Sequence, residues 1–129
     1  MTIPVERMRS LRWGLELLSM MQTDQTVPEV MRSQATGLQP AYPTPEALNQ
    51  LLALRAELLP MSLADSIEAA GKLFVQLRLS GLGAEGTRRH LMFTERHFPV
   101  QGDALSMATL GAYGGLAEWL EREEPARAD

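Results

Sequence analysis

The stretch from Pro4 to Gln22, PVERMRSLRWGLELLSMMQ, decides the fold class. Its apolar residues recur at spacings of three and four, which is the repeat of an α-helix that buries one face. These residues are Met8, Leu11, Leu15, Leu18 and Met21, and Leu17 widens the stripe. We therefore expect a first helix from Pro4 to about Gln22.

Proline and glycine signals divide the rest of the chain into further helical segments. A short second helix should begin at Pro28 and run to about Leu38, and the prolines that follow, up to Pro45, form a rigid connector. Later helices are expected over about 45–59, 62–80, 84–97 and 103–122. Thr44 and Ser62 are natural N-caps for the first two of these later helices. The sequence thus predicts an all-α fold of about six helices packed in a bundle.

The last of these helices contains three glycines, and each costs a helix roughly 1 kcal/mol relative to alanine. Either a neighbour packs closely against Gly111, Gly114 and Gly115, or the helix breaks there. Because apolar residues flank the glycines on both sides, we favour close packing within one continuous helix.

The length of 129 residues is that of one domain. We expect a single helical domain over residues 1–123 and a flexible acidic tail over 124–129. Sliding the sequence on itself by 56 positions aligns Ser10 with Ser66, Leu17 with Leu73, Arg32 with Arg88, and Tyr42-Pro43 with Phe98-Pro99. The segments 5–59 and 61–122 therefore fit two copies of a three-helix unit, with chance similarity as the alternative.

Composition sets several function classes aside. The chain has no cysteine, so it has no disulfide, no thiolate nucleophile and no cysteine-containing zinc site. Glu16 interrupts the apolar residues of the first helix, which are too few for a signal-peptide core or a membrane span. We therefore expect a cytoplasmic protein that contacts no membrane.

The net charge of −4 argues against a broad nucleic-acid surface, but the fifth predicted helix is locally basic. It carries Arg88, Arg89, His90, Arg96 and His97, and a second cluster on the first helix comprises Arg7, Arg9 and Arg12. Solvated or paired charges are the commoner interpretation of such clusters. The turn Gly81-Leu82-Gly83 suits a helix-turn-helix arrangement, although the start of the fifth helix lacks a convincing set of base-reading residues.

Residues for metal binding or catalysis are sparse. His90 and His97 are seven positions apart, about 10 Å along a helix, which is too far for one metal ion. Glu16 and Glu57 would form a carboxylate pair only if folding brings them together, and no serine stands in a nucleophile elbow. We therefore expect no metal, no cofactor and no catalytic residues, and a protein that is not an enzyme.

Two tryptophans are candidates for contacts with a partner. Trp13 and Trp119 are each next to charged residues and near a chain terminus. Each either anchors an interface or closes one end of the core. Six of the methionines likewise suit either an adaptable binding groove or an ordinary core, namely Met20, Met21, Met31, Met61, Met92 and Met107.

The run Thr2-x-Pro4-x-Glu6-Arg7-x-Arg9-x-Leu11, with Tyr42-Pro43-Thr44 further on, resembles a family of short uncharacterised proteobacterial helical proteins. The family pattern reads Glu-Arg-Thr-Arg near the start and His-Tyr-Pro later. This chain has Met8 in place of the Thr and Ala41 in place of the His. The resemblance covers about the first 50 residues. It implies a bacterial source and a helical fold, and it implies no activity.

We interpret the chain as a bacterial protein-interaction module that acts as a small regulator, adaptor or inhibitor by binding an unknown partner protein. The candidate binding residues are Arg88, Arg89, His90, Arg96, His97, Trp13 and Trp119. The alternative is a DNA-associated transcriptional regulator that uses the basic fifth helix. The two interpretations differ in whether the arginines of that helix are free or paired. A small-molecule enzyme is a third interpretation, and the sequence leaves a homodimer open.

Overall fold

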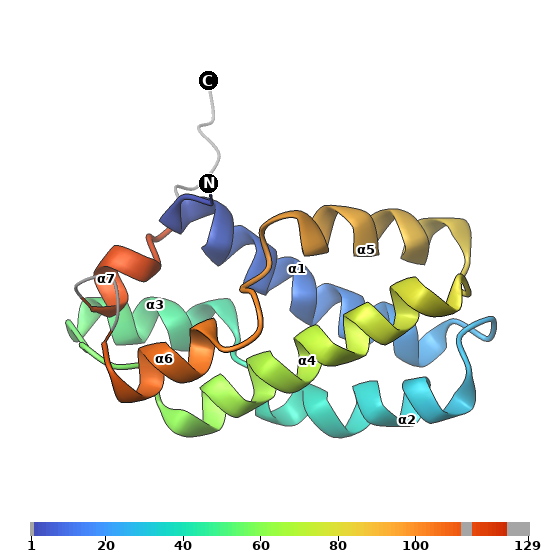
Figure 1. The fold of residues 1–129 in the computed structure, drawn as a ribbon, viewed down its shortest axis with the longest axis horizontal. Coiled ribbons are helices and arrows are strands. Elements are labelled where there is room, and N and C mark those ends of the chain that lie inside the picture. The colour runs from blue at the N-terminus through green and yellow to red at the C-terminus, as the bar shows by residue number, and fades with distance from the viewer. Residues whose placement is uncertain (1, 112–114, 124–129) are drawn as a thin grey trace.

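The computed structural model describes residues 2–111 and 115–123, and all regular structure in this part of the chain is helical (Figure 1). The elements are α1 (Pro4–Thr23), α2 (Glu29–Leu38), the 3₁₀ turn η1 (Gln39–Ala41), α3 (Pro45–Ala53), α4 (Met61–Ser80), α5 (Glu85–His97), α6 (Asp103–Thr109) and α7 (Leu116–Trp119). The prediction of an all-α bundle is confirmed. None of these helices is long and apolar enough to cross a membrane.

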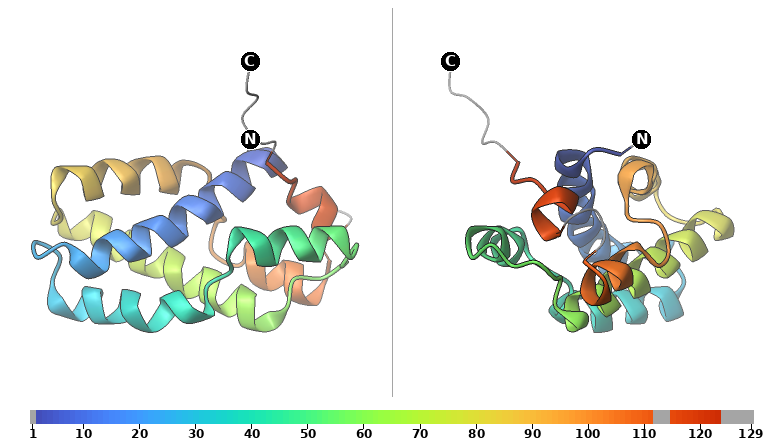
Figure 2. Two further views of the ribbon diagram at one scale, coloured as in Figure 1. Left: turned by 180° about the vertical axis from the view of Figure 1, so that it is seen from behind. Right: turned by 60° about the vertical axis from the view of Figure 1, so that its left-hand side comes forward.

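Helix α1 lies at the centre of the bundle, with α5 on one side and α2 on the other (Figures 1 and 2). Helix α4 packs against α2 and α6, while α3, α6 and α7 gather at one end of the molecule, on the left in Figure 1. Leu17 and Leu18 of α1 are both fully buried. Because neighbouring residues on a helix point about 100° apart, α1 must be covered on more than one side.

Gly14 lets two aromatic side chains approach α1 closely. The Tyr42 hydroxyl donates a hydrogen bond to the carbonyl of Leu11 at 2.7 Å. A Cβ atom at position 14 would lie 2.5 Å from that hydroxyl and 2.9 Å from Cε2 of Phe98. Phe98 also packs edge-on against Phe74, with 5.3 Å between the ring centroids. The aromatic residues of Tyr42-Pro43 and Phe98-Pro99 therefore meet at one point of α1.

The two halves of the chain share an order of elements. Each has a helix of 20 residues (α1 and α4), then a shorter helix (α2 and α5), then a short one (α3 and α6). The halves interleave, since α1 packs against α5, and α2 against α4. The duplication of a three-helix unit stays a prediction.

The third helix is shorter than its leucine pattern indicates. The leucine pattern predicts a helix to Leu59, but α3 ends at Ala53. The N–H of Leu59 donates to a carbonyl of α6 at 3.1 Å, and the carbonyl of Glu57 accepts from the N–H of Leu116 at 3.0 Å. These two bonds and the burial of Leu59 require residues 54–59 to leave the helix. Tertiary packing therefore overrides the helical pattern of the leucines.

The prediction of one continuous helix over 103–122 is wrong. Helix α6 ends at Thr109 and α7 begins at Leu116. Gly111 has a φ of +59° and Gly115 a φ of +115°, which glycine adopts readily and an α-helix excludes. The glycines therefore break the helix. Gly114 and the predicted tail over 124–129 lie outside the described residues.

The helix starts agree with the sequence signals in part. The Thr44 hydroxyl accepts the N–H of Ala47 at 3.1 Å, so the predicted cap of α3 is confirmed. Helix α4 starts at Met61, directly after Pro60, with no side-chain cap. The predicted cap at Ser62 is therefore wrong, because Ser62 already lies within the first turn.

Candidate partner-binding groove between α4 and α5

A tight turn places α5 beside α4 and sends it in the opposite direction (Figure 1). Gly81 and Gly83 reverse the chain with φ values of +70° and +112°. Arg88 then reaches back, and its Nη1 donates to the carbonyls of Leu77 at 2.9 Å and Leu82 at 3.0 Å. A charged donor bound to two carbonyls of the preceding helix end and turn holds the first turns of α5 in place.

A carboxylate from the turn after α1 fixes the start of α5. Asp24 accepts the N–H of Ala84 at 2.8 Å and the hydroxyl of Thr26 at 2.6 Å. Desolvation alone would raise the pKa of this carboxyl, but hydrogen bonds from Thr26, Ala84 and Thr87 hold its pKa well below the ordinary 3.8. A negative charge at a helix N-terminus is also favourable. Asp24 thus stabilises α5 across the fold.

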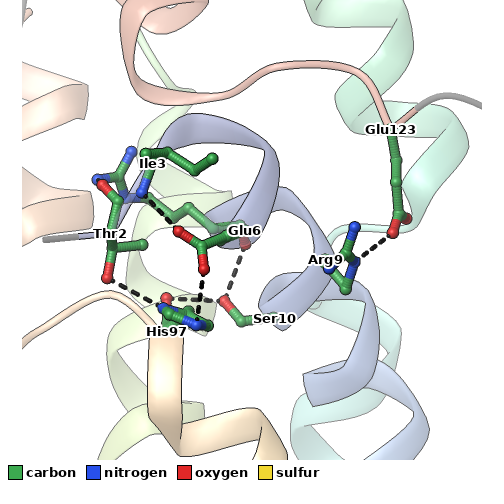
Figure 3. A network of polar contacts seen from close by, with 8 residues as sticks. Thr2, Ile3, Glu6, Arg9, Ser10, His97 and Glu123 are labelled. Atoms are coloured by element: carbon green, nitrogen blue, oxygen red, sulfur yellow. Dashed lines mark hydrogen bonds and ion pairs between the residues drawn. The ribbon is translucent and has the colours of Figure 1, made fainter.

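The end of α5 is tied to the start of α1 by a polar cluster (Figure 3). His97 Nε2 lies 2.9 Å from the Glu6 carboxylate, and its Nδ1 lies 3.3 Å from the Thr2 hydroxyl. Glu6 also accepts the N–H of Ile3 at 3.1 Å. The Ser10 hydroxyl bonds the backbone carbonyl of His97 at 2.9 Å and not its ring. The cluster therefore resembles a structural tie more than a nucleophile with its base.

The second histidine of α5 also faces α1. His90 Nε2 lies 3.0 Å from the carbonyl of Trp13 and 3.5 Å from the Glu16 carboxylate. The side chains of His90 and His97 are 20% and 26% exposed. Glu57 lies in the segment between α3 and α4, where its backbone contacts the start of α7. Within residues 2–111 and 115–123, no three His, Cys, Asp or Glu side chains converge in a way that would hold a metal ion.

The arginines of α5 are neither all free nor all paired. Arg88 is bound to carbonyls of the turn, as described above. Arg89 pairs with Glu85 at 2.9 Å, but both side chains are mostly exposed, and such pairs contribute little. Arg96 has no hydrogen-bond or ion-pair partner among the described residues. The outer face of α5 therefore keeps accessible positive charge.

The two tryptophans differ in exposure. Trp119 is fully buried, with the guanidinium of Arg7 over its ring at 5.5 Å from the centroid and bonded to its carbonyl. Trp13 is half-buried, and Arg9 lies 6.0 Å from its ring centroid. Trp119 thus closes the core beside the start of α1 and presents no surface to a partner in this structure.

An apolar pocket of about 570 Å³ opens between α4 and the segment that follows α5. Its lining residues are Ile67, Glu68, Gly71, Lys72, Phe74, Val75, Gln76, Glu95, Phe98, Pro99, Val100 and Gln101. Phe98 lies close to α4 because Gly71 has no side chain, and a Cβ there would lie 3.3 Å from the Phe98 ring. Pro99 disfavours a helical conformation at Phe98, so α5 ends at His97 and residues 98–101 continue along the pocket.

A second, basic pocket of about 790 Å³ lies between the end of α4 and the outer face of α5. Its lining residues are Arg78, Glu85, Arg88, Arg89, Leu91, Met92, Glu95 and Arg96. Four arginines and two glutamates give it a local charge of +2, although the chain carries −4. Leu91 is buried beneath it, while Met92 is 60% exposed. The basic pocket therefore combines an accessible apolar side chain with positive charge.

An ion pair joins the two helices where the pockets meet. Arg78 of α4 lies 3.0 Å from Glu95 of α5, and Glu95 lines both pockets. The apolar pocket and the basic pocket thus form one surface along α4 and α5, which we call the α4–α5 groove. Val75 lines the groove, and Leu79, one turn further along α4, is 74% exposed.

No family model, curated protein or solved structure matches this chain significantly. The resemblance to short proteobacterial proteins therefore stays a prediction. Two of the residues on which this resemblance rests have structural roles. The Tyr42 hydroxyl donates a hydrogen bond to the backbone of α1, and the Glu6 carboxylate accepts one from the backbone at the start of α1.

Sequence reasoning identified the basic side of the groove and missed its apolar side. Arg88, Arg89 and Arg96 were candidate binding residues, and all three line the basic pocket. The sequence does hold a signal for the apolar side of the groove. Val75 and Leu79 of α4 are four positions apart and lie outside the buried stripe of that helix. This pair adds exposed apolar surface to an otherwise polar helix face.

Proposed function

We propose that this protein is a non-enzymatic interaction module, a small regulator, adaptor or inhibitor, that binds a partner protein in the α4–α5 groove. The exposed apolar side chains within a charged rim carry this proposal. Met92 is 60% exposed and lines the basic pocket among its arginines, and Val75 is 38% exposed and lines the apolar pocket. Protein interfaces have apolar centres with polar rims, and methionine and arginine are enriched in them.

The anchoring of α5 also supports the proposal. Arg88 and Asp24 fix its start, and His90 and His97 hold its inner face against α1. The outer face of α5 is then a preformed wall of the groove. Binding to a preformed surface costs less conformational entropy than binding to a mobile one.

The DNA-associated alternative has less support. Arg88 is bound to backbone carbonyls, and Arg89 has Glu85 beside it. The basic pocket is a local patch with two carboxylates among its four arginines, and it lacks the long row of unpaired cations with which proteins follow a phosphate backbone. Of the arginines Arg88, Arg89 and Arg96, only Arg96 has no hydrogen-bond or ion-pair partner in the described part of the chain.

Affinity capture with matched variants tests the proposal. The tagged full-length protein is incubated with bacterial lysate, with and without nuclease, and bound proteins are identified by mass spectrometry. Met92→Asp places a charge in the groove. Val30→Asp makes the same kind of change on α2, on the other side of α1, where Val30 is 70% exposed (Figure 1). We expect wild type and Val30→Asp to retain one nuclease-resistant partner that Met92→Asp loses.

Two results would contradict the proposal. Loss of all bound species after nuclease treatment would favour the DNA-associated alternative. Equal capture by Met92→Asp and Val30→Asp would show that the partner binds outside the groove.

A further inference from the structure

We propose that the occupant of the α4–α5 groove is an amphipathic α-helix of the partner protein, apolar where it enters the apolar pocket and acidic where it faces Arg89 and Arg96. This inference rests on the proposed function and adds the chemistry of the partner. Three properties of the groove support it.

The first property is its shape. The basic part of the groove lies between the antiparallel helices α4 and α5, and its apolar part lies between α4 and the segment after α5 (Figure 1). The apolar face of a third helix commonly fills such a groove. On α5 the groove extends from Glu85 to Arg96, which is about 16 Å along a helix axis. An occupant helix that follows it therefore places residues about three turns apart against its two ends.

The second property is the apolar pocket. Its apolar lining includes Val75, Phe98 and Val100, and its volume of about 570 Å³ is within the range of pockets that bury a ligand-sized group. Side chains one turn apart on an amphipathic helix, at i and i+3 or i+4, lie on the same face. Two aliphatic or aromatic residues at that spacing suit this end of the groove.

The third property is the distribution of charge. The basic pocket has a local charge of +2, whereas the apolar pocket has one lysine and two glutamates, a local charge of −1. Arg96 has no partner among the described residues, and Arg89 has only a solvent-exposed one. Acidic side chains are therefore favoured at the basic end and not at the apolar end. The occupant helix is therefore expected to bind in one direction, with its acidic residues at the basic end of the groove and its apolar residues at the other end.

Selection from a displayed library tests this inference directly. The full-length protein is the target for a library of randomised helical peptides of about 18 residues, five turns long. We expect enriched peptides to carry two apolar residues at i and i+3 or i+4, and an excess of acidic residues one to two turns away. A synthetic peptide of the most enriched sequence is then titrated against variants by fluorescence anisotropy.

The variants separate the two ends of the groove. Arg89→Glu with Arg96→Glu should weaken binding on the order of tenfold at low salt and by less at high salt. Val75→Asp should abolish binding. Arg55→Glu with Arg122→Glu, at two exposed arginines outside the groove, is the matched charge control and should bind as wild type does.

Other results would overturn the inference. Enriched peptides without an acidic excess, or equal binding by the Arg89→Glu, Arg96→Glu variant, would refute the charge argument. A chain that dimerises in analytical ultracentrifugation, with Met92→Asp monomeric, would show that a second copy occupies the groove. If lysate capture depends on Met92 but the selection yields no helical binder, the helical occupant is refuted and the interaction module stands.

Discussion

Replacing Gly14 with alanine tests the closest packing in the core. The added Cβ would lie 2.5 Å from the Tyr42 hydroxyl and 2.9 Å from a ring carbon of Phe98. Both neighbours are held in place. Tyr42 is hydrogen-bonded to Leu11, and Phe98 already contacts α4 at Gly71. The alanine therefore pushes on two side chains that have little room to move.

The structure gives the size of the effect. Overpacking a core costs about 1–3 kcal/mol, and loss of the buried Tyr42 hydrogen bond costs about 1 kcal/mol. Alanine in place of glycine within a helix stabilises the folded state by about 1 kcal/mol, which offsets part of this cost. We expect the free energy of unfolding to fall by about 2 kcal/mol, and the Tm to fall by roughly 5–10 °C.

Urea and thermal unfolding followed by circular dichroism measure this change. The matched control is Gly37→Ala on α2, where an added Cβ meets nothing within 4 Å. It should raise stability by up to about 1 kcal/mol. Combining Gly14→Ala with Tyr42→Phe should cost less than the sum of the single changes, because the contacting hydroxyl is gone. Gly14→Ala that matches wild type, or gains as much as Gly37→Ala, would refute the packing.

Three further outcomes concern α5 and Tyr42, each measured by urea unfolding. Asp24→Asn should cost about 1 kcal/mol near neutral pH. Because the folded state lowers the pKa of Asp24, its contribution is complete above pH 3.8 and declines as the pH falls below that value. Tyr42→Phe should cost about 1 kcal/mol. Because burial raises the pKa of Tyr42 above 10.0, the wild type should lose stability more steeply than this variant above pH 10.0. Leu91→Ala, at a buried residue, should cost about 3 kcal/mol, whereas Met92→Ala should change stability by less than about 0.5 kcal/mol.

Each of these outcomes has a result that would contradict it. If the free energy of unfolding of Asp24→Asn falls with acid as that of wild type does, ionisation of Asp24 is not the cause of the wild-type pH dependence. Identical alkaline profiles for wild type and Tyr42→Phe would place the phenol in solvent. Equal costs for Leu91→Ala and Met92→Ala would mean that α5 presents another face to the core.

The sequence was sufficient for the helices whose own pattern decides their ends. Helix α1 has a continuous apolar stripe, and α5 ends before a proline, so both were located to within about two residues. The third helix was overestimated, because its leucines continue past Ala53. Its end depends on backbone bonds with α6 and α7, which no local pattern records.

The groove shows the same division. Charged residues on one helix are visible in the sequence, and Arg88, Arg89 and Arg96 were identified from it. Which of them are paired depends on residues that the fold brings close, such as the carbonyls of the preceding turn. The apolar pocket depends on Phe98 turning towards Gly71, a contact between two elements. Only the folded chain shows that these features belong to one surface.

Photo-crosslinking from Met92 tests the central claim most directly. A photoreactive amino acid replaces Met92 in one variant and Val30 in another, and each is irradiated in nuclease-treated lysate. We expect a covalent adduct with one discrete protein from position 92 and none from position 30. An adduct from position 30 alone, or equal adducts from both positions, would contradict binding in the α4–α5 groove.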